Sequence, residues 1–211
     1  MKQLKFGENV DIKKKRRLSR KEKHLSKLSD IFEGKKTHGW SCGLTLFDSK
    51  LYGWWPGYMY VIGGRRGMGK TTWNISIING FLKKNQNIRI FFASLDMTKE
   101  RIINSLAELR TNISLYEVRD GTVQVNGKDQ FLKEVSDLYE SKNIEIVDLV
   151  DCKTYDEMIS RFDELSVDGK FDVFILDHFQ KAAKAFESQL EGSRNLANDL
   201  HALILDKELV A

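Results

Sequence analysis

Residues 63–72 read GGRRGMGKTT and directly follow the apolar run YMYVI at residues 58–62. The stretch fits the pattern G-x-x-x-x-G-K-[ST] through Gly64, Gly69, Lys70 and Thr71. Glycines let the backbone curl so that its N–H groups face phosphate oxygens, and a helix that begins here presents its positive end to the same anion. The stretch therefore predicts a phosphate-binding loop between a strand and a helix.

This loop is predicted to bind ATP. Lys70 would reach the β- and γ-phosphates, and the hydroxyl of Thr71 would hold Mg²⁺. A glycine-rich turn that matches by chance is the alternative, but the strand-like run before the loop and the helical period after it favour nucleotide binding. The predicted nucleotide-binding residues are Gly64, Arg65, Arg66, Gly67, Met68, Gly69, Lys70, Thr71 and Thr72.

A magnesium partner is expected at the end of a second buried strand, because phosphate-loop enzymes hold the ion between the loop and a carboxylate. Asp177 ends the run DVFILD, whose apolar residues would be buried in a sheet while the carboxylate emerges at the edge where open α/β sheets bind ligands. We therefore predict Thr71 and Asp177 as the Mg²⁺ residues. The neighbouring His178 is predicted to pack or to hydrogen-bond rather than to catalyse.

The composition is that of a soluble α/β protein with a basic appendage. The chain has 211 residues, of which 41% are hydrophobic, and a formal net charge of +4. The first 36 residues hold 13 of the 34 Lys and Arg and 5 of the 30 Asp and Glu, which leaves 21 cations against 25 anions in the rest. Cys42 and Cys152 lack metal-type spacing and favour unpaired thiols. Neither a membrane span nor a signal peptide is visible, so we expect a cytoplasmic protein.

From residue 40 onward, short apolar runs alternate with longer segments of helical period. This order predicts a mostly parallel sheet that is covered by helices. Strands are predicted at 58–62, 88–95, 144–148 and 172–176, and helices at 71–82, 98–109, 130–140, 154–165 and 195–209. Thr154 and Glu157 also have the spacing of a capping box at a helix start.

Two parts of the chain are predicted: a basic N-terminal helix or linker at 1–39 and an ATPase domain at 40–211. The cations of residues 13–17 could contact nucleic-acid phosphates without sequence preference. They could instead belong to a helix that docks on an adjacent subunit, or to an inert arm. The apolar residues that fall near one face of this helix are Leu18, Leu25, Leu28 and Phe32.

The chain resembles the RecA-like motor domain of hexameric replicative DNA helicases of the DnaB type. The resemblance runs from Trp40 to the C-terminus and includes the approach to the loop, GLTLFDSKLYGWWPGYMYVIGG at 43–64. Asp177 and Gln180, together with FASLDM, favour this family over other RecA-like ATPases. The stretches that carry the resemblance are GGRRGMGKTT, FFASLDM at 91–97, IEIVD at 144–148 and FILDHFQ at 174–180.

The resemblance implies a RecA-like P-loop NTPase fold and an ATP-dependent DNA helicase motor that uses ATP and Mg²⁺ and works as a hexameric ring on single-stranded DNA. It also implies that Asp96 orients the attacking water, so that Asp96 and Lys70 are the predicted catalytic residues. The family has Glu in place of Asp96. Asp is shorter by one methylene, which would set the base back by about 1 Å and can cost about a hundredfold in rate. Alternatively, Asp96 caps the helix that begins near Thr98.

The resemblance further implies a core strand, DNA-contacting loops and an arginine that reaches the neighbouring subunit's ATP, all after the helix at 195–209. The sequence ends at Ala211, so we expect a fold that lacks this part and leaves strand edges unpaired beside the phosphate loop. A truncated chain, one half of a split gene and a decayed gene all remain open explanations.

Nucleic-acid contacts are predicted at Lys181, Lys184 and Arg194, which flank the segment after Asp177 that faces the central channel of the ring in this family. A solvated loop is an equally good explanation for each of them. A different function also stays open: a nucleotide-binding assembly or regulatory subunit with little turnover, favoured by Asp96 and by the absent C-terminal part. A recombinase-like or clock-like RecA relative is a third possibility.

Overall fold

The computed structural model describes residues 20–34, 39–123, 126–166, 170–183 and 189–210. The chain forms two compact units, Met1–Thr37 and His38–Ala211. The described residues of the first unit, 20–34, form the helix α1 (Arg20–Phe32), in which Leu25, Leu28 and Phe32 are exposed. Leu18 and the basic cluster at 13–17 lie outside the described residues.

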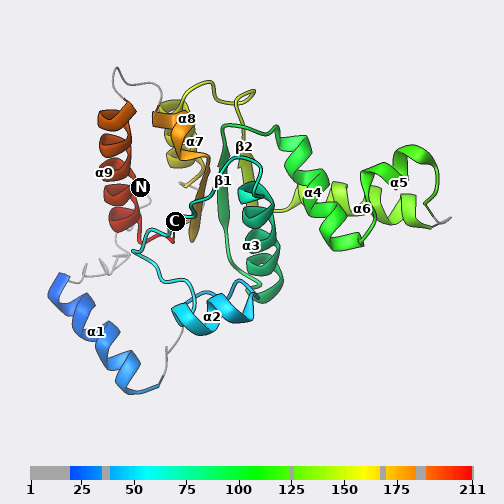
Figure 1. Cartoon of the computed structure of the whole chain (residues 1–211). Coiled ribbons are helices and arrows are strands. Elements are labelled where there is room, and N and C mark those ends of the chain that lie inside the picture. Colours follow the sequence, from blue (N-terminus) through cyan, green and yellow to red (C-terminus); the bar gives the residue numbers. More distant parts are fainter. Residues whose placement is uncertain (1–19, 35–38, 124–125, 167–169, 184–188, 211) are drawn as a thin grey trace, which may run out of the picture. The chain divides into compact units, whose positions relative to one another are not determined.

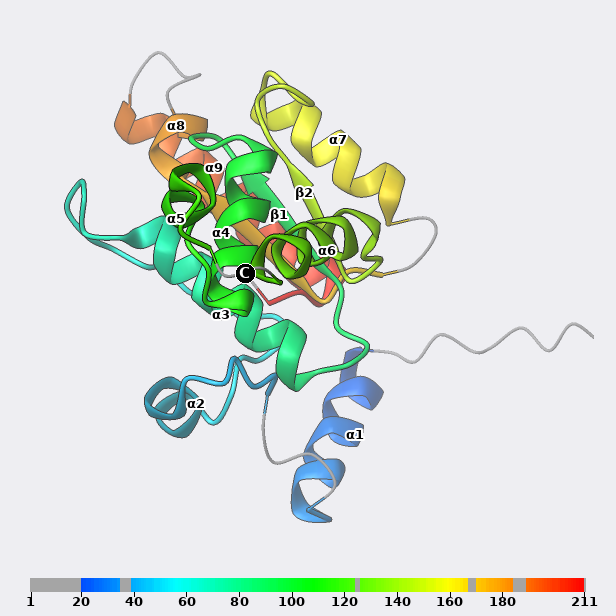
Figure 2. The ribbon, with the colours of Figure 1, turned by 90° about the vertical axis from the view of Figure 1, so that its right-hand side faces the viewer.

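The second unit is a parallel sheet with helices on both of its faces (Figures 1 and 2). Its strand order is β2-β1-β3, and both strand pairs are parallel. The predicted α/β class and mostly parallel sheet are thereby confirmed. The elements of this unit are α2 (Thr45–Leu51), α3 (Lys70–Lys84), β1 (Ile90–Ser94), α4 (Lys99–Thr111), α5 (Leu115–Asp120), α6 (Gly127–Glu140), β2 (Ile144–Val147), α7 (Tyr155–Leu165), β3 (Val173–Asp177), α8 (Phe179–Ala183) and α9 (Gln189–Lys207).

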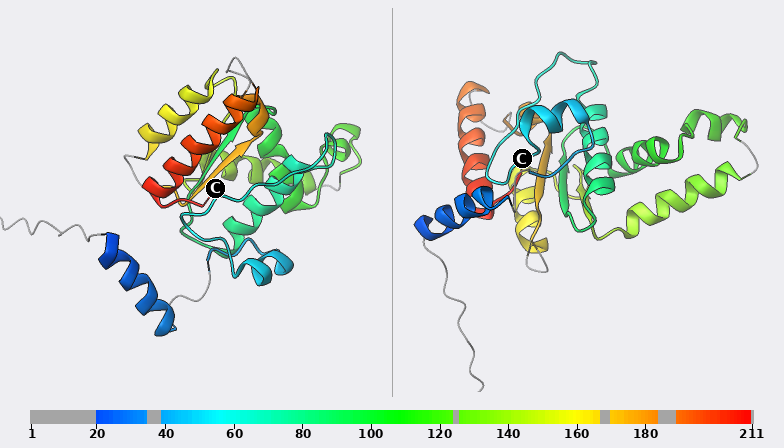
Figure 3. Two further views of the ribbon diagram at one scale, coloured as in Figure 1. Left: turned by 60° about the vertical axis from the view of Figure 1, so that its left-hand side comes forward. Right: turned by 90° about the horizontal axis from the view of Figure 1, so that it is seen from below.

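Successive side chains of the central strand β1 point to opposite faces of the sheet. Ile90 and Phe92 pack into a core with residues of α3, α4 and α6. Phe91 and Ala93 pack into a second core with residues of α7, α8 and α9. Figure 3 shows α7 and α9 together over this second face. Because both faces are covered, β1 is buried along its whole length, which suits the apolar residues that precede its last residue, Ser94.

The predicted strand at 58–62 is wrong. Within this segment only Tyr58 makes a bridge, which is parallel and joins it to Val210. Val210 also bridges Val173 of β3, so it lies between Tyr58 and the sheet. A strand needs a ladder partner for each of its residues, and the described chain offers one to Tyr58 alone. The rest of the segment stays irregular, with Val61 82% exposed. This lack of ladder partners next to the phosphate loop agrees with the unpaired strand edges expected from the sequence.

Three smaller predictions from the sequence can be compared with the structure. Cys42 and Cys152 are free and buried. No described helix combines the length and the apolar character that crossing a membrane would need. Half of the expected capping box is present, because the Thr154 hydroxyl accepts a hydrogen bond from the Glu157 N–H at 3.2 Å. The Glu157 carboxylate, however, accepts from the Lys153 N–H at 2.7 Å and not from that of Thr154.

Thr154→Ala is expected to lower the free energy of unfolding by about 1 kcal/mol, because it removes the hydroxyl that satisfies an N–H group of the first turn of α7. Urea denaturation followed by circular dichroism measures this change. The matched control is Thr98→Ala: Thr98 is the N-cap of α4 but makes no side-chain cap hydrogen bond. Equal losses in the two variants would contradict the assigned cap.

Candidate nucleotide-binding site

The phosphate loop is exposed and leads directly into α3. Gly67 and Gly69 adopt φ angles of 81° and 83°, which favour glycine because a Cβ atom would strain the backbone there. The Lys70 ammonium donates to the backbone carbonyls of Gly64 at 3.0 Å and Arg65 at 3.2 Å, so the lysine side chain lies along the loop that contains it. The loop thus surrounds the lysine predicted to contact phosphates.

The N-terminus of α3 lies directly at the phosphate loop. Its N-cap is Gly69, which has no side chain to accept a bond from the N–H groups of the first turn. Thr71 and Thr72 lie in that turn. These N–H groups, together with the positive end of a helix of 15 residues, form an arrangement that suits an anion.

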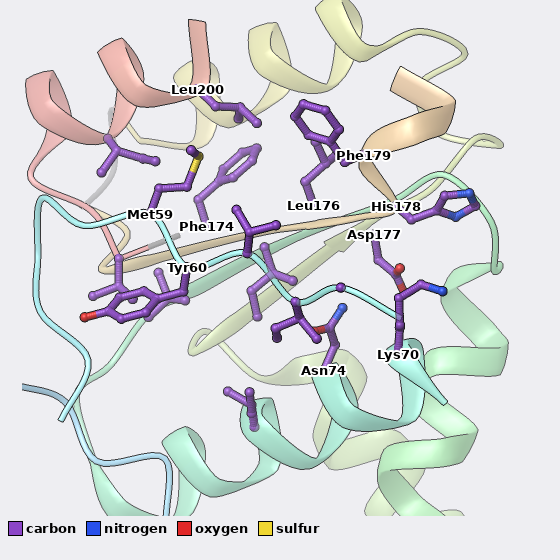
Figure 4. A pocket seen from close by; sticks show the side chains of 18 of the residues that line it. Met59, Tyr60, Lys70, Asn74, Phe174, Leu176, Asp177, His178, Phe179 and Leu200 are labelled. Atoms are coloured by element: carbon purple, nitrogen blue, oxygen red, sulfur yellow. The ribbon is translucent and has the colours of Figure 1, made fainter. Parts of the chain in front are cut away.

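Asp177 and the phosphate loop line the same cavity. It is the last residue of β3 and only 4% exposed, and within the described residues its carboxylate has no hydrogen-bond or ion-pair partner. The cavity measures about 280 Å³ and is lined by residues 59–64, β3 and α9 as well as by Lys70 and Asn74. In Figure 4, Asp177, His178 and Lys70 gather at one end of it, and Tyr60, Met59 and Leu200 line the rest. The cavity therefore has one polar end and long apolar walls.

The set of polar groups at this end fits Mg²⁺. A buried carboxylate without a partner is costly unless a cation or a donor reaches it. No group of three or more His, Cys, Asp or Glu that could hold a metal occurs among the described residues. Mg²⁺ does not need such a group, since it is bound by one or two carboxylates and completes its shell with phosphates and water.

Asp96 lies two residues beyond β1, beside the end of β3. The strands are in register with Ser94 opposite Asp177, and the Leu95 N–H donates to the Asp177 carbonyl at 2.6 Å. The Asp96 carboxylate accepts a hydrogen bond from the Lys181 ammonium at 2.5 Å. It does not cap α4, whose N-cap is Thr98, so the alternative prediction from the sequence is wrong.

Two hydrogen-bonded groups that the sequence did not reveal hold the turn containing Asp96. The Ser94 hydroxyl donates to the Met97 carbonyl at 2.6 Å and accepts from the Met97 N–H at 3.1 Å. Asp148, buried at the end of β2, accepts from the Lys99 N–H at the start of α4 at 2.6 Å. It also accepts from the N–H of Val150 at 2.7 Å. The sequence signal for Asp148 was its place directly after an apolar strand.

Two of the three cationic residues predicted to contact DNA lie in the described part of the chain. Lys181 is paired with Asp96, and Arg194 is exposed on α9. Lys184 lies outside the described residues.

In the phosphate loop, the predicted nucleotide-binding residues Arg65, Arg66 and Met68 are exposed. Their predicted nucleotide contacts stay predictions.

Comparison with known proteins gives the family. The model of the DnaB-like helicase C terminal domain matches residues 39–209. A solved structure described as an ATPase domain is similar, with a TM-score of 0.75 and 18% identity over 89% of this chain and 68% of that protein. A structure described as a DnaB-like replicative helicase and its interactions with primase gives a TM-score of 0.73 and 18% identity, over 92% of this chain and 47% of that protein.

The two structures support the RecA-like fold, and at 18% identity they support no more than the fold. The chain spans about two thirds of the first protein and about half of the second. The family match is stronger evidence, since it extends from residue 39 to residue 209, just beyond α9, and includes the phosphate loop, Asp96 and Asp177. The chain therefore belongs to the family of DnaB-like helicase C-terminal domains and is a motor domain of that type.

Proposed function

We propose that this domain binds ATP with Mg²⁺ at the phosphate loop and hydrolyses it to drive a DNA helicase that works as a ring on single-stranded DNA. One observation carries the proposal. The parallel register of β1 and β3 brings the turn of Asp96 and the carboxylate of Asp177 to the sheet edge that the loop and α3 also face. Ligands of open parallel sheets bind at this edge.

Each residue has a role that suits its surroundings. The Lys70 ammonium would exchange its two carbonyl partners for the β- and γ-phosphate oxygens, while the first N–H groups of α3 bind the same phosphates. The Thr71 hydroxyl and the Asp177 carboxylate would hold Mg²⁺, which when bound offsets negative charge on the phosphates. Asp96 would orient a water molecule and accept its proton.

Single-stranded DNA and a ring-shaped homo-oligomer are proposed from family membership. Two features of the chain suit a polyanion: the net basic charge of the first 36 residues and the exposed cation Arg194 on α9. Such contacts would bind all sequences alike, because lysine and arginine bind backbone phosphates without reading the bases.

The alternative function, a nucleotide-binding subunit with little turnover, is favoured by one observation. The Asp96 carboxylate is already engaged by Lys181, and an engaged carboxylate is a poor acceptor for a proton from water. If that pair never opens, ATP would bind at the loop and remain unhydrolysed.

Phosphate release, measured with and without oligo(dT), is expected to separate these functions. ATP hydrolysis that requires Mg²⁺ and rises severalfold with oligo(dT) would support the motor, and chelation of Mg²⁺ by EDTA should abolish it. Tight ATP binding without release, in either condition, would support the low-turnover subunit. A chain that does not bind ATP at all would contradict both functions.

A further inference from the structure

The candidate base lies close to Lys181, His178 and Arg66. The Lys181 ammonium donates to one oxygen of Asp96 at 2.5 Å, and His178 Nδ1 lies 4.0 Å from the other oxygen. Arg66 of the phosphate loop contributes further positive charge. The hydrogen bond from Lys181 is the main cause that lowers the pKa of Asp96 below its usual value, with smaller effects from the charges of Lys181, His178 and Arg66. In this state Asp96 remains ionised, and one of its two carboxylate oxygens is hydrogen-bonded to the Lys181 ammonium.

The ion pair between Lys181 and Asp96 can be broken without disturbing the backbone. Both side chains are partly exposed, at 39% for Lys181 and 49% for Asp96, and water and salt weaken ion pairs in such positions. The backbone of Lys181 is held, because its N–H donates to the His178 carbonyl at 3.0 Å in the turn that leads from β3 into α8. Breaking the pair therefore needs only a rotation of the lysine side chain.

We propose that Lys181 is a phosphate-operated switch. When no phosphate is near, Lys181 holds Asp96, and a phosphate group that captures the Lys181 ammonium releases the carboxylate to orient water. This inference rests on the proposed function, since it concerns the regulation of the same site. The phosphate has two possible sources, the γ position of the nucleotide and the backbone of a nucleic acid. Lys181 is thus a positioning residue that acts through Asp96.

The location of Lys181 favours such a role. It lies four residues beyond Asp177, on the short helix α8 that follows β3 directly, and its side chain is partly exposed at the rim of the site. A phosphate that binds near α8 can therefore reach the lysine without entering the core. A cation bound to a phosphate has less affinity for a neighbouring carboxylate, because both anions compete for the same N–H donors.

The first test measures the ionisation of Asp96 by carboxyl ¹³C NMR during a pH titration. Lys181→Met removes the ammonium and keeps the length of the side chain, so the pKa of Asp96 should rise in the variant. The matched control is Lys207→Met, since Lys207 and Asp163 form a pair at 2.9 Å with exposures of 37% and 51%. This control should leave the pKa of Asp96 unchanged. An unchanged pKa in Lys181→Met would overturn the proposal.

The second test adds phosphate to the wild-type protein in two arms, oligo(dT) without nucleotide and a non-hydrolysable ATP analogue without DNA. A rise of the Asp96 pKa in one arm identifies the source, provided that most of this rise is absent in Lys181→Met. If neither phosphate moves the pKa in the wild type, the pair is a fixed block and the switch is overturned. Binding of oligo(dT) and of the analogue is verified separately, so a failure of the proposed function is distinguished from a failure of the switch.

Hydrolysis provides the third readout. If DNA is the source, Lys181→Met is expected to release phosphate severalfold faster than the wild type when DNA is absent, and it should lose most of its stimulation by oligo(dT). If the γ-phosphate is the source, ATP itself opens the pair, so the variant should keep the wild-type stimulation by oligo(dT). Where oligo(dT) raises the Asp96 pKa in the second test, a wild-type basal rate and wild-type stimulation in Lys181→Met would overturn the proposal, and so would a rate that falls in both conditions. The Lys207→Met control should retain both the basal rate and the stimulation.

Discussion

Asp96→Asn is expected to lower the rate of ATP hydrolysis at least about a hundredfold while leaving ATP affinity within about twofold of the wild type. Asparagine has nearly the same size and can still contact water, but its amide cannot accept a proton. The side chain lies at the edge of the site and has no contact with the loop carbonyls that hold Lys70, so binding should persist. Single-turnover phosphate release and calorimetric titration with ATP measure the two effects separately.

Asp96→Glu is the informative counterpart. The added methylene would extend the carboxylate towards the position that Glu has in this family, so hydrolysis should be faster than in the wild type or equal to it. If Asp96→Asn hydrolyses ATP as fast as the wild type, then Asp96 is not the base. The low-turnover subunit would then be the better account of the chain.

Lys70→Ala is expected to weaken ATP binding by about a hundredfold or more, because hydrogen bonds between an ammonium and phosphate oxygens are among the strongest in proteins. Calorimetric titration with ATP and Mg²⁺ measures this loss. Folding should be preserved, since the hydrogen bonds described for the lysine ammonium go to the carbonyls of Gly64 and Arg65 in the exposed loop. The thermal unfolding midpoint should therefore remain close to that of the wild type.

The matched control for this prediction is Lys83→Ala in the last turn of the same helix, α3, where the lysine is exposed and far along the helix from the loop. It removes the same charge and leaves the phosphate loop intact, so ATP affinity should not change. If Lys70→Ala binds ATP as tightly as Lys83→Ala, the loop does not bind the nucleotide phosphates.

The parts of the fold that the sequence predicts well are those with strong local signals. The strands β1, β2 and β3 are short apolar runs buried on both faces, and all three form where the pattern places them. The long helices have enough turns to show their period. By contrast, α2, α5 and α8 have five to seven residues, which is at most two turns, and no period can be read from them. Only α5 offered a signal, the capping box of Ser114 and Glu117.

The candidate site was predictable residue by residue but not as a set of contacts. A motif of ten residues contains Lys70 and Thr71, the end of an apolar run points to Asp177, and Asp96 follows from the resemblance to the family. The pairing of Asp96 with Lys181 joins residues 85 apart in the sequence and depends on the register of β1 against β3. No local pattern specifies that register, so the sequence predicted Lys181 as a DNA contact or as part of a solvated loop, and not as the partner of Asp96. The segment at 58–62 was predicted as a strand for the same reason: its apolar sequence suits a strand, but a strand forms only where a neighbouring strand pairs with it, and the described chain offers a partner to Tyr58 alone.

The attachment of this segment has a thermodynamic consequence for nucleotide binding. Residues 59–64 connect Tyr58, bridged to Val210, with the phosphate loop that Lys70 closes, and Val61 between them is largely exposed. Fixing each such residue costs conformational entropy of about 1–2 kcal/mol. If ATP binding orders the segment, that loss offsets part of the gain from the phosphate contacts. Any neighbouring strand that ordered residues 59–64 beforehand would therefore strengthen ATP binding without touching the nucleotide.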